Sequence, residues 1–220
     1  MLLATYYWTN GDTDSAWNAL KAAAHASVGA TSSLLAVANQ QLQYAAYNGA
    51  RSTLRSVPPV DRSYQWLFAE GQVDAVLGTV AQVNLEFQRA IELTPLGQRA
   101  NWLLLIGNTW LSQGQYIQAL ASYEQATLAQ GQVDAVQLQL QIATTETLLG
   151  DPTEAASVYE KVLTMGVAGT RRQNVEIALA RDLVSAGEVN QALVLLKTLL
   201  RSKLGAPTRI EVQALIDAIE

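Results

Sequence analysis

Apolar residues recur every three or four positions over residues 100–131, which is the spacing of one face of an α-helix. A glycine, Gly114, interrupts this stripe near its middle. The pattern therefore predicts two amphipathic helices, over 101–113 and 116–129, that are joined by a short turn. The stripe mixes small and large side chains: Ile106, Gly107, Trp110, Tyr116, Ala119, Tyr123 and Ala126. Small residues opposite large ones are typical of a closely packed helical hairpin.

The same pattern recurs along the chain with a spacing of 36 residues. Five positions have counterparts one spacing later: Gly71, Gly78, Phe87, Ala90 and Pro95 precede Gly107, Gly114, Tyr123, Ala126 and Gly131. Four clearer repeats are predicted, over 64–97, 100–133, 136–169 and 173–204. Two degenerate repeats are predicted before them, over 1–30 and 31–60. A last amphipathic helix over 208–219 has one polar face, which suits the cap of a helical stack.

Two stretches carry conflicting or degenerate signals for their helix boundaries. The repeat register places a break near Gly78, whereas a six-residue sequence shared with a later helix start places a turn at Gly71; we prefer the break near Gly78. In the second repeat, the pattern predicts a helix over 32–47 that is ended by Asn48-Gly49. A short helix over 50–57 is expected to follow and to be stopped by two successive prolines.

Capping signals predict two helix starts in the second half of the chain. Asp151 precedes Pro152, and this pair suits the cap and the first residue of a helix. Thr208 is followed three positions later by Glu211, which is the spacing of a capping box. We therefore expect one helix to begin after Asp151 and the last helix to begin after Thr208.

The central unit resembles the tetratricopeptide repeat, whose pattern is W-x2-L-G-x2-Y, then A-x3-F and a late Pro, with a period of about 34 residues. The residues that carry the resemblance are Ile106-Gly107 for Leu-Gly, Trp110 for Tyr, and Ala119 with Tyr123 for A-x3-F. Leu103 stands where the Trp is expected and Gly131 replaces the Pro. The resemblance implies an all-α, right-handed superhelical solenoid of about five helical hairpins plus a C-terminal capping helix, in a single domain over 1–220.

The composition fits a folded helical chain. Half of the 220 residues are apolar, 15% are charged and five are prolines, which favours helices around a sizeable core. The net charge of −5 and the pI near 4.9 argue against nucleic acid or an anionic membrane as the main partner. We interpret the densest positive spot, Arg171-Arg172, as a solvated loop.

The opening of the chain is apolar over residues 1–8. This stretch is too short to cross a bilayer, which takes about 20 residues, and it lacks the positive segment of a signal peptide. We therefore expect no membrane insertion and interpret these residues as the end of a helix that starts before Met1, in a fragment of a longer protein. The compartment stays open: we favour the cytoplasm, and a fragment is also compatible with a periplasmic or membrane-tethered protein.

Side chains suited to catalysis or metal binding are scarce. The chain has no cysteine, and its one histidine, His25, has no second histidine or cysteine with which to share a metal. Asp12 and Asp14 are expected at a helix entrance, where negative charge is favourable. The sequence contains no phosphate-binding glycine loop, dinucleotide fingerprint or nucleophile elbow. We therefore predict no enzymatic activity, no bound metal and no cofactor.

In tetratricopeptide proteins, the first helix of each pair lines most of the inner surface. The resemblance therefore implies twelve groove residues: Gln65, Phe68, Gln72, Asn101, Leu104, Asn108, Gln137, Leu140, Thr144, Asn174, Ile177 and Arg181. Their amides and hydroxyls suit the backbone of an extended peptide, and the apolar members would form shallow sockets. The alternative interpretation is that glutamine is simply a common helix-surface residue in this chain.

The predicted function is that of a scaffold or adaptor that holds a protein or peptide partner in this groove. Because the groove has almost no positive charge, we do not expect the acidic peptide C-termini that some family members hold. One alternative is a small-molecule or lipid-binding helical domain. Another is a self-associating subunit that forms a homo-oligomer through its apolar N-terminal helix: Leu2, Leu3, Tyr6, Tyr7 and Trp8.

Overall fold

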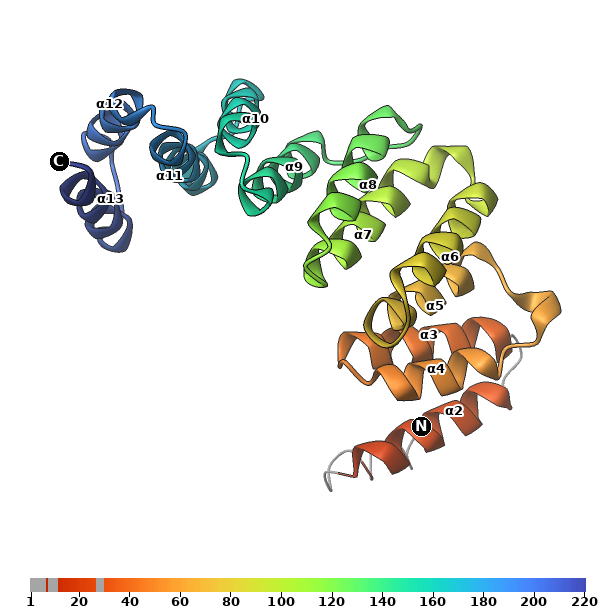
Figure 1. The fold of residues 1–220 in the computed structure, drawn as a ribbon. Helices are drawn as coiled ribbons and strands as arrows, with labels where there is room; N and C mark the ends of the chain where they lie inside the picture. Colours follow the sequence, from red (N-terminus) through yellow and green to blue (C-terminus); the bar gives the residue numbers. More distant parts are fainter. Residues whose placement is uncertain (1–6, 8–11, 27–29) are drawn as a thin grey trace. The chain divides into compact units, whose positions relative to one another are not determined.

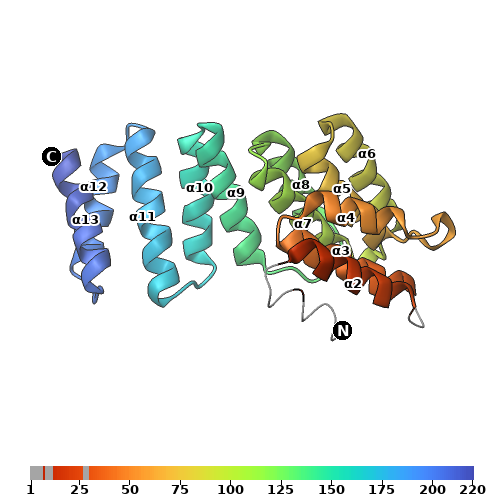
Figure 2. The same cartoon turned by 90° about the horizontal axis from the view of Figure 1, so that it is seen from below.

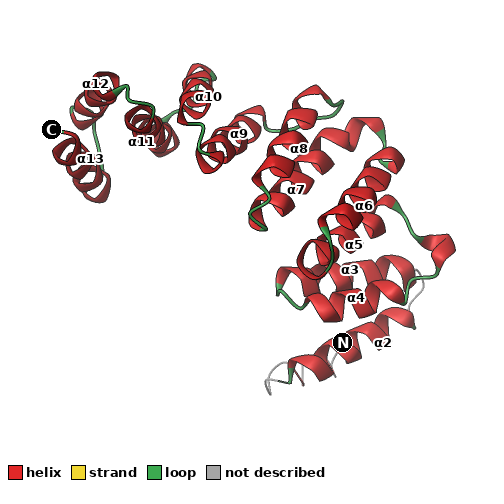
Figure 3. Cartoon of the chain, in the orientation of Figure 1, coloured by secondary structure: helices red, strands yellow, loops and turns green. Residues whose placement is uncertain are grey.

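The structure is a computed structural model that describes residues 7, 12–26 and 30–220, and these residues contain helices, turns and no strand (Figure 3). The α-helices are α2 Thr13–His25, α3 Ala30–Gln43, α4 Tyr47–Arg55, α5 Tyr64–Leu77, α6 Val80–Leu93, α7 Arg99–Ser112, α8 Tyr116–Leu128, α9 Ala135–Leu149, α10 Pro152–Thr164, α11 Gly169–Ser185, α12 Val189–Leu200 and α13 Ala206–Ile219. Two short 3-10 helices, Pro59–Asp61 and Leu96–Gln98, precede α5 and α7. The prediction of an all-α helical-repeat fold is confirmed. The predicted pairing through the N-terminal helix lies outside the described residues, apart from Tyr7.

The helices form two compact units, Met1–Trp102 and Leu103–Glu220. Within the second unit, helices α9 to α13 lie side by side in chain order (Figures 1 and 2). Each helix packs against the next one in the sequence, from α8 through to α13. This arrangement is that of a helical-repeat stack, in which local contacts between successive helices bury a shared interior. The prediction of one domain over 1–220 stays a prediction.

A glycine facing an aromatic ring brings the two helices of a repeat together. A Cβ atom added to Gly107 in α7 would lie 2.3 Å from Cε1 of Tyr123 in α8, well inside van der Waals contact. A Cβ atom added to Gly71 in α5 would lie 2.5 Å from Cε1 of Phe87 in α6. The small residue therefore lets the ring press against the helix backbone, as the sequence pattern predicts for the crossing of α7 and α8.

Later repeats keep the same spacing but have alanine in place of the glycine. Each glycine is separated from its ring by 16 positions, and the same separation joins Ala143 to Tyr159 and Ala180 to Leu196. All four of these residues are buried. An alanine in these two repeats therefore stands where the earlier repeats have glycine, so a small residue recurs at this position of the first helix.

The core of the first unit is built around two tryptophans. Trp17 and Trp66 are both buried, together with aliphatic side chains that include Leu34, Leu54 and Val73. The indole Nε1 of Trp66 donates a hydrogen bond to the backbone oxygen of Leu54, at 2.9 Å. This bond satisfies the one polar atom that burying the indole brings into the core.

The second repeat differs from its predicted boundaries. Helix α3 ends at Gln43 and α4 begins at Tyr47, so Asn48 and Gly49 lie in the first turn of α4 and do not end α3. The chain turns at Ala45, which has a left-handed backbone with φ of 56°. Glycine usually occupies such a position after a helix, and an alanine there carries no signal that the sequence pattern can detect.

Three other boundary predictions can be compared with the structure. Helix α5 ends at Leu77 with Gly78 as its cap, so the break near Gly78 is confirmed. Asp151 accepts a hydrogen bond from the backbone of Glu154, which confirms the predicted cap of α10. The predicted capping box is wrong, because α13 already begins at Ala206 with a proline in its first turn. That proline is favourable at a helix start and moves the boundary forward.

Candidate binding groove

Helices α9 and α11 face each other across a groove of about 320 Å³ in the second unit. One end is closed by Arg171, which donates a hydrogen bond to Oε1 of Gln137 at 3.5 Å. Near the other end of the helices, the hydroxyl of Thr147 donates to Oδ2 of Asp182 at 2.9 Å. These two links join positions 34 and 35 residues apart, so the two helices run in the same direction, in register with the repeat.

Four of the twelve predicted groove residues line this groove: Gln137, Leu140, Thr144 and Asn174. Five further residues complete its wall: Gln141, Tyr159, Arg171, Val175 and Ala178. Polar amides therefore alternate with small or aliphatic side chains along the two helices. We name this set of nine residues the α9–α11 groove.

A tyrosine from the neighbouring helix supports the wall of the groove. The hydroxyl of Tyr159 in α10 lies 3.3 Å from that of Thr144, within hydrogen-bond distance. One repeat earlier, the hydroxyl of Tyr123 donates to Oδ1 of Asn108 at 2.8 Å. Burial raises the pKa of Tyr123 above its usual range, so this hydroxyl stays protonated. Asn108 and Thr144 thus have internal partners, which fix their side chains.

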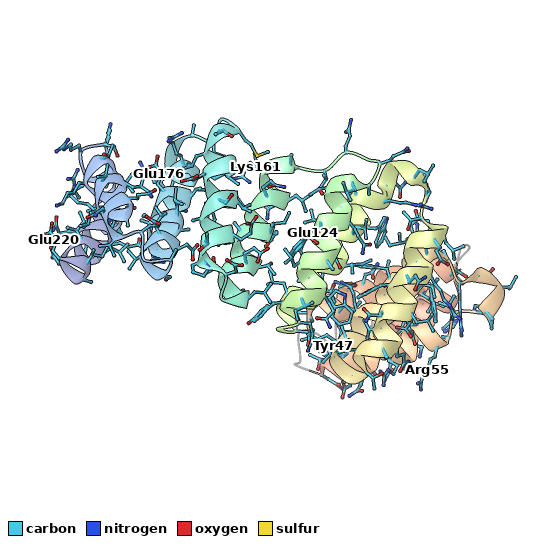
Figure 4. The ribbon with its side chains drawn as sticks, turned by 45° about the horizontal axis from the view of Figure 1, so that its top comes forward. Tyr47, Arg55, Glu124, Lys161, Glu176 and Glu220 are labelled. Carbon is cyan, nitrogen blue, oxygen red and sulfur yellow. The ribbon has the colours of Figure 1, made fainter. Side chains whose placement is uncertain are left out.

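The charge at the groove comes from Arg171. Its guanidinium lies 4.0 Å from the carboxylate of Asp134, a long and exposed ion pair that contributes little stability. Arg172 instead pairs with Glu176 at 2.8 Å, four residues along the same helix; Glu176 is labelled in Figure 4. The interpretation of Arg171-Arg172 as a loop is therefore wrong, because both lie in the first turns of α11. The loop ends earlier, at Gly169, where φ is 59°.

The other eight predicted residues lie outside this groove. Phe68 is buried against Trp102 and Phe87, with ring centroids 4.5 and 5.7 Å apart, and Ile177 is also buried. Arg181 is exposed and pairs with Glu211 of α13 at 2.8 Å. The remaining five are half-buried or exposed on α5 and α7: Gln65, Gln72, Asn101, Leu104 and Asn108. Phe68 and Ile177 thus belong to the packed interior and offer no sockets.

Two further features of the described residues concern metal binding and membrane crossing. Among them, no group of three or more histidine, aspartate or glutamate side chains is placed to hold a metal ion. Within the same part of the chain, no helix has the length together with the apolar composition that crossing a bilayer requires.

Residues 136–215 match a family described as tetratrico peptide repeat. No curated protein sequence matches this chain. The structure is similar to that of the C-terminal part of a tetratricopeptide repeat-containing protein from Cytophaga hutchinsonii, with 16% identity, a TM-score of 0.62, and 96% of this chain and 78% of that one covered. It is also similar to PilF of Pseudomonas aeruginosa, with 15% identity, a TM-score of 0.55, and 86% and 87% covered.

A third similar structure is a signal transduction ATPase of Pyrococcus horikoshii with a tetratricopeptide repeat sensor, at 12% identity and a TM-score of 0.64, covering 98% of this chain and 37% of that one. At these identities the similarity shows the fold alone. The fold therefore defines this chain as a helical-repeat protein. More specifically, residues 136–215 match the tetratricopeptide-repeat family, and the chain has the tetratricopeptide fold. Repeats of this family are in general non-catalytic scaffolds for protein interactions.

Proposed function

We propose that this chain is a non-catalytic scaffold that binds an extended polypeptide segment in the α9–α11 groove. The observation that carries this proposal is the make-up of the groove wall. Gln137, Gln141 and Asn174 bring amides that both donate and accept hydrogen bonds, as a peptide backbone requires. Leu140, which is half-buried, lies among them as an apolar contact for a side chain of the partner.

The internal hydrogen bonds decide which residues a test should change. Asn108 holds the Tyr123 hydroxyl and Arg181 holds Glu211, so replacing either residue would disturb the fold as well as any binding surface. Gln137 keeps only the long contact with Arg171, and Asn174 is exposed in α11. Gln137 and Asn174 are therefore the more informative positions.

The double variant Gln137→Ala/Asn174→Ala is expected to lose most of the partner that the unchanged chain retains. Each lost peptide hydrogen bond costs about 0.5–1.5 kcal/mol, so the affinity should fall about tenfold. The measurement is affinity capture on the immobilised chain, followed by titration of the captured protein. The matched control is Gln132→Ala/Asn84→Ala, which also removes one glutamine amide and one asparagine amide, but at exposed positions outside the groove.

The control variant should bind like the unchanged chain, and all three proteins should show the same circular dichroism. If the groove variant retains the partner at full affinity, the α9–α11 groove is not the binding surface. If both variants lose the partner equally, the interaction depends on surface amides in general and the proposal also fails.

A further inference from the structure

A second pocket, of about 530 Å³, lies in the first unit between α2, the end of α3 and the start of α4. Its wall combines polar and apolar residues: Asp14, Trp17, Asn18, Lys21, Gln41, Ala45, Ala46, Tyr47, Asn48, Gly49, Ser52, Thr53 and Leu77. We name it the α2–α4 pocket. None of these residues belongs to the α9–α11 groove, so the pocket is independent of the proposed function.

The first turn of α4 opens into this pocket with unsatisfied backbone donors. The N-cap residue is Ala46, and no side chain caps the helix. The backbone N–H groups of Tyr47, Asn48 and Gly49 have no hydrogen-bond acceptor among the described residues. Figure 4 labels Tyr47, the first residue of the helix. Three free N–H groups at the positive end of a helix dipole attract an anion.

Lys21 adds a positive charge on the wall formed by α2. Its Nζ donates to the backbone oxygen of Ser52 at 3.1 Å and to the Ser52 hydroxyl at 3.0 Å. Both acceptors are neutral, and the described residues give Lys21 no carboxylate partner. An ammonium group has three donors, so one N–H remains for a ligand, and the charge is not compensated.

Gln41 adds a second, independent hydrogen-bond donor to this wall. The residue is only 2% exposed, and its Oε1 accepts a hydrogen bond from the Thr53 hydroxyl at 2.8 Å. Its Nε2 has no hydrogen-bond partner among the described residues. This nitrogen points toward Gly49 on the pocket wall, since a Cβ atom added to Gly49 would lie 2.9 Å from it. This nitrogen is not among the fully buried side-chain atoms that lack a partner, so it is open to the pocket, where a ligand oxygen can accept a hydrogen bond from it.

From this convergence of donors, we propose that the α2–α4 pocket binds the phosphate group of a small organic phosphate ester. The Lys21 ammonium, the Gln41 amide and the first N–H groups of α4 are all donors, and phosphate offers several strong acceptor oxygens to them. A volume of about 530 Å³ also has room for an organic group. Trp17 and Leu77 are the apolar contacts for that group.

Asp14 restricts what the organic group can be. It lies on the same pocket wall, seven residues before Lys21 on α2, which places it about 10 Å from Lys21 along the helix axis. A carboxylate at that distance repels a second anionic group. The ligand therefore carries its negative charge at one end and is neutral or positively charged at the other.

Inorganic phosphate and phenyl phosphate, titrated into the full chain at constant ionic strength, test this proposal. Amide NMR signals of Asn48 and Gly49 should shift and saturate with both probes. Phenyl phosphate should bind at least about threefold more tightly, since its ring adds apolar contacts. The absence of saturation up to about 20 mM of either probe, which is an affinity weaker than about 2.3 kcal/mol, would overturn the proposal. Equal affinities for the two probes would show that the pocket recognises only the phosphate group, and would contradict the proposal of an organic phosphate ester.

Two variants and a matched control locate the site. Lys21→Met should weaken phenyl phosphate binding about tenfold, the effect of one charge-assisted hydrogen bond. Gly49→Ala should weaken it similarly, because the new Cβ displaces the Gln41 amide. Lys161→Met removes the same charge from α10 in the second unit, at a lysine labelled in Figure 4, and should change the affinity less than twofold. The amide spectrum reports whether each variant is folded. An unchanged affinity in a folded Lys21→Met or Gly49→Ala chain contradicts the site, as does an equal loss in Lys161→Met.

Discussion

Replacing Gly107 with alanine is expected to lower the free energy of unfolding by about 2–3 kcal/mol, which is typical of overpacking a core. In an ordinary helix the same change would stabilise the chain by about 0.5–1 kcal/mol. Here the new Cβ would lie 2.3 Å from Cε1 of Tyr123 and 2.8 Å from Cζ. The ring is fully buried and its hydroxyl is held by Asn108, so it has little room to move. The measurement is urea denaturation followed by far-UV circular dichroism.

Gly97→Ala is the matched control for this prediction. Nothing lies within 4 Å of a Cβ atom added there, so stability should stay within about 0.5 kcal/mol of the unchanged chain. The loss from Gly107→Ala should also be smaller in a chain that carries Tyr123→Leu, because the two residues are in contact and their effects are not additive. A Gly107→Ala chain as stable as the original would disprove the close packing of α7 against α8.

The second large effect concerns a group of acidic side chains in the first unit. Asp74 of α5 forms an ion pair with Arg51 of α4 and accepts a hydrogen bond from Nε2 of Gln82 at 2.8 Å. Glu70 and Glu86 lie beside it, and one carboxylate oxygen of each is buried without a hydrogen-bond partner. The cluster therefore has three carboxylates and one directly paired arginine, Arg51, while the charges of Arg55 and Arg62 also act on Glu70.

Burial raises the pKa of Glu86 to about 7, and the negative charges of Asp74 and Glu70 add to this effect. Burial raises the pKa of Glu70 as well. Because the folded chain holds a proton that the unfolded chain releases near pH 4.5, stability falls as the pH rises from 4.5 to 7. Above pH 7 Glu86 is ionised in the folded chain, and the full cost of burying its charge lowers the free energy of unfolding.

Glu86→Gln is therefore expected to stabilise the chain at pH 8 by about 2 kcal/mol, after allowance for the partial exposure of this side chain. At pH 4.5 the change should be below about 0.5 kcal/mol, since the glutamate is then already protonated. The measurement is urea denaturation at both pH values. Glu92→Gln, on the exposed side of the same helix, is the control and should show no such difference. Equal effects of Glu86→Gln at the two pH values would rule out the proton that we assign to Glu86.

The sequence contains enough information to predict the repeat packing. Gly107 and Tyr123 lie 16 positions apart, and so do Gly71 and Phe87. The two pairs are themselves 36 residues apart. The repeat pattern in the sequence therefore identifies a contact between the two helices of each repeat. The turn at Ala45 is different, since an alanine with a left-handed backbone has no local signal in the sequence.

The groove could be predicted only in part, for a physical reason. Helical periodicity shows which residues share a face, but it does not show how far neighbouring helices cover that face. Leu140 and Ile177 have corresponding places in the predicted pattern, yet Leu140 lines the groove and Ile177 is buried. Tyr159 was missed because it reaches the groove from the second helix of its repeat. The α2–α4 pocket was missed because its donors come from three different helices.

The most direct test of the groove is site-specific photo-crosslinking. A photo-reactive phenylalanine derivative at Leu140 lies in the α9–α11 groove, and the same derivative at Leu128 lies on an exposed part of α8 outside it. We predict that the chain labelled at Leu140 crosslinks to the captured partner and that the chain labelled at Leu128 does not. Crosslinks from Leu128 alone, or equal yields from both positions, would contradict binding of a polypeptide in this groove.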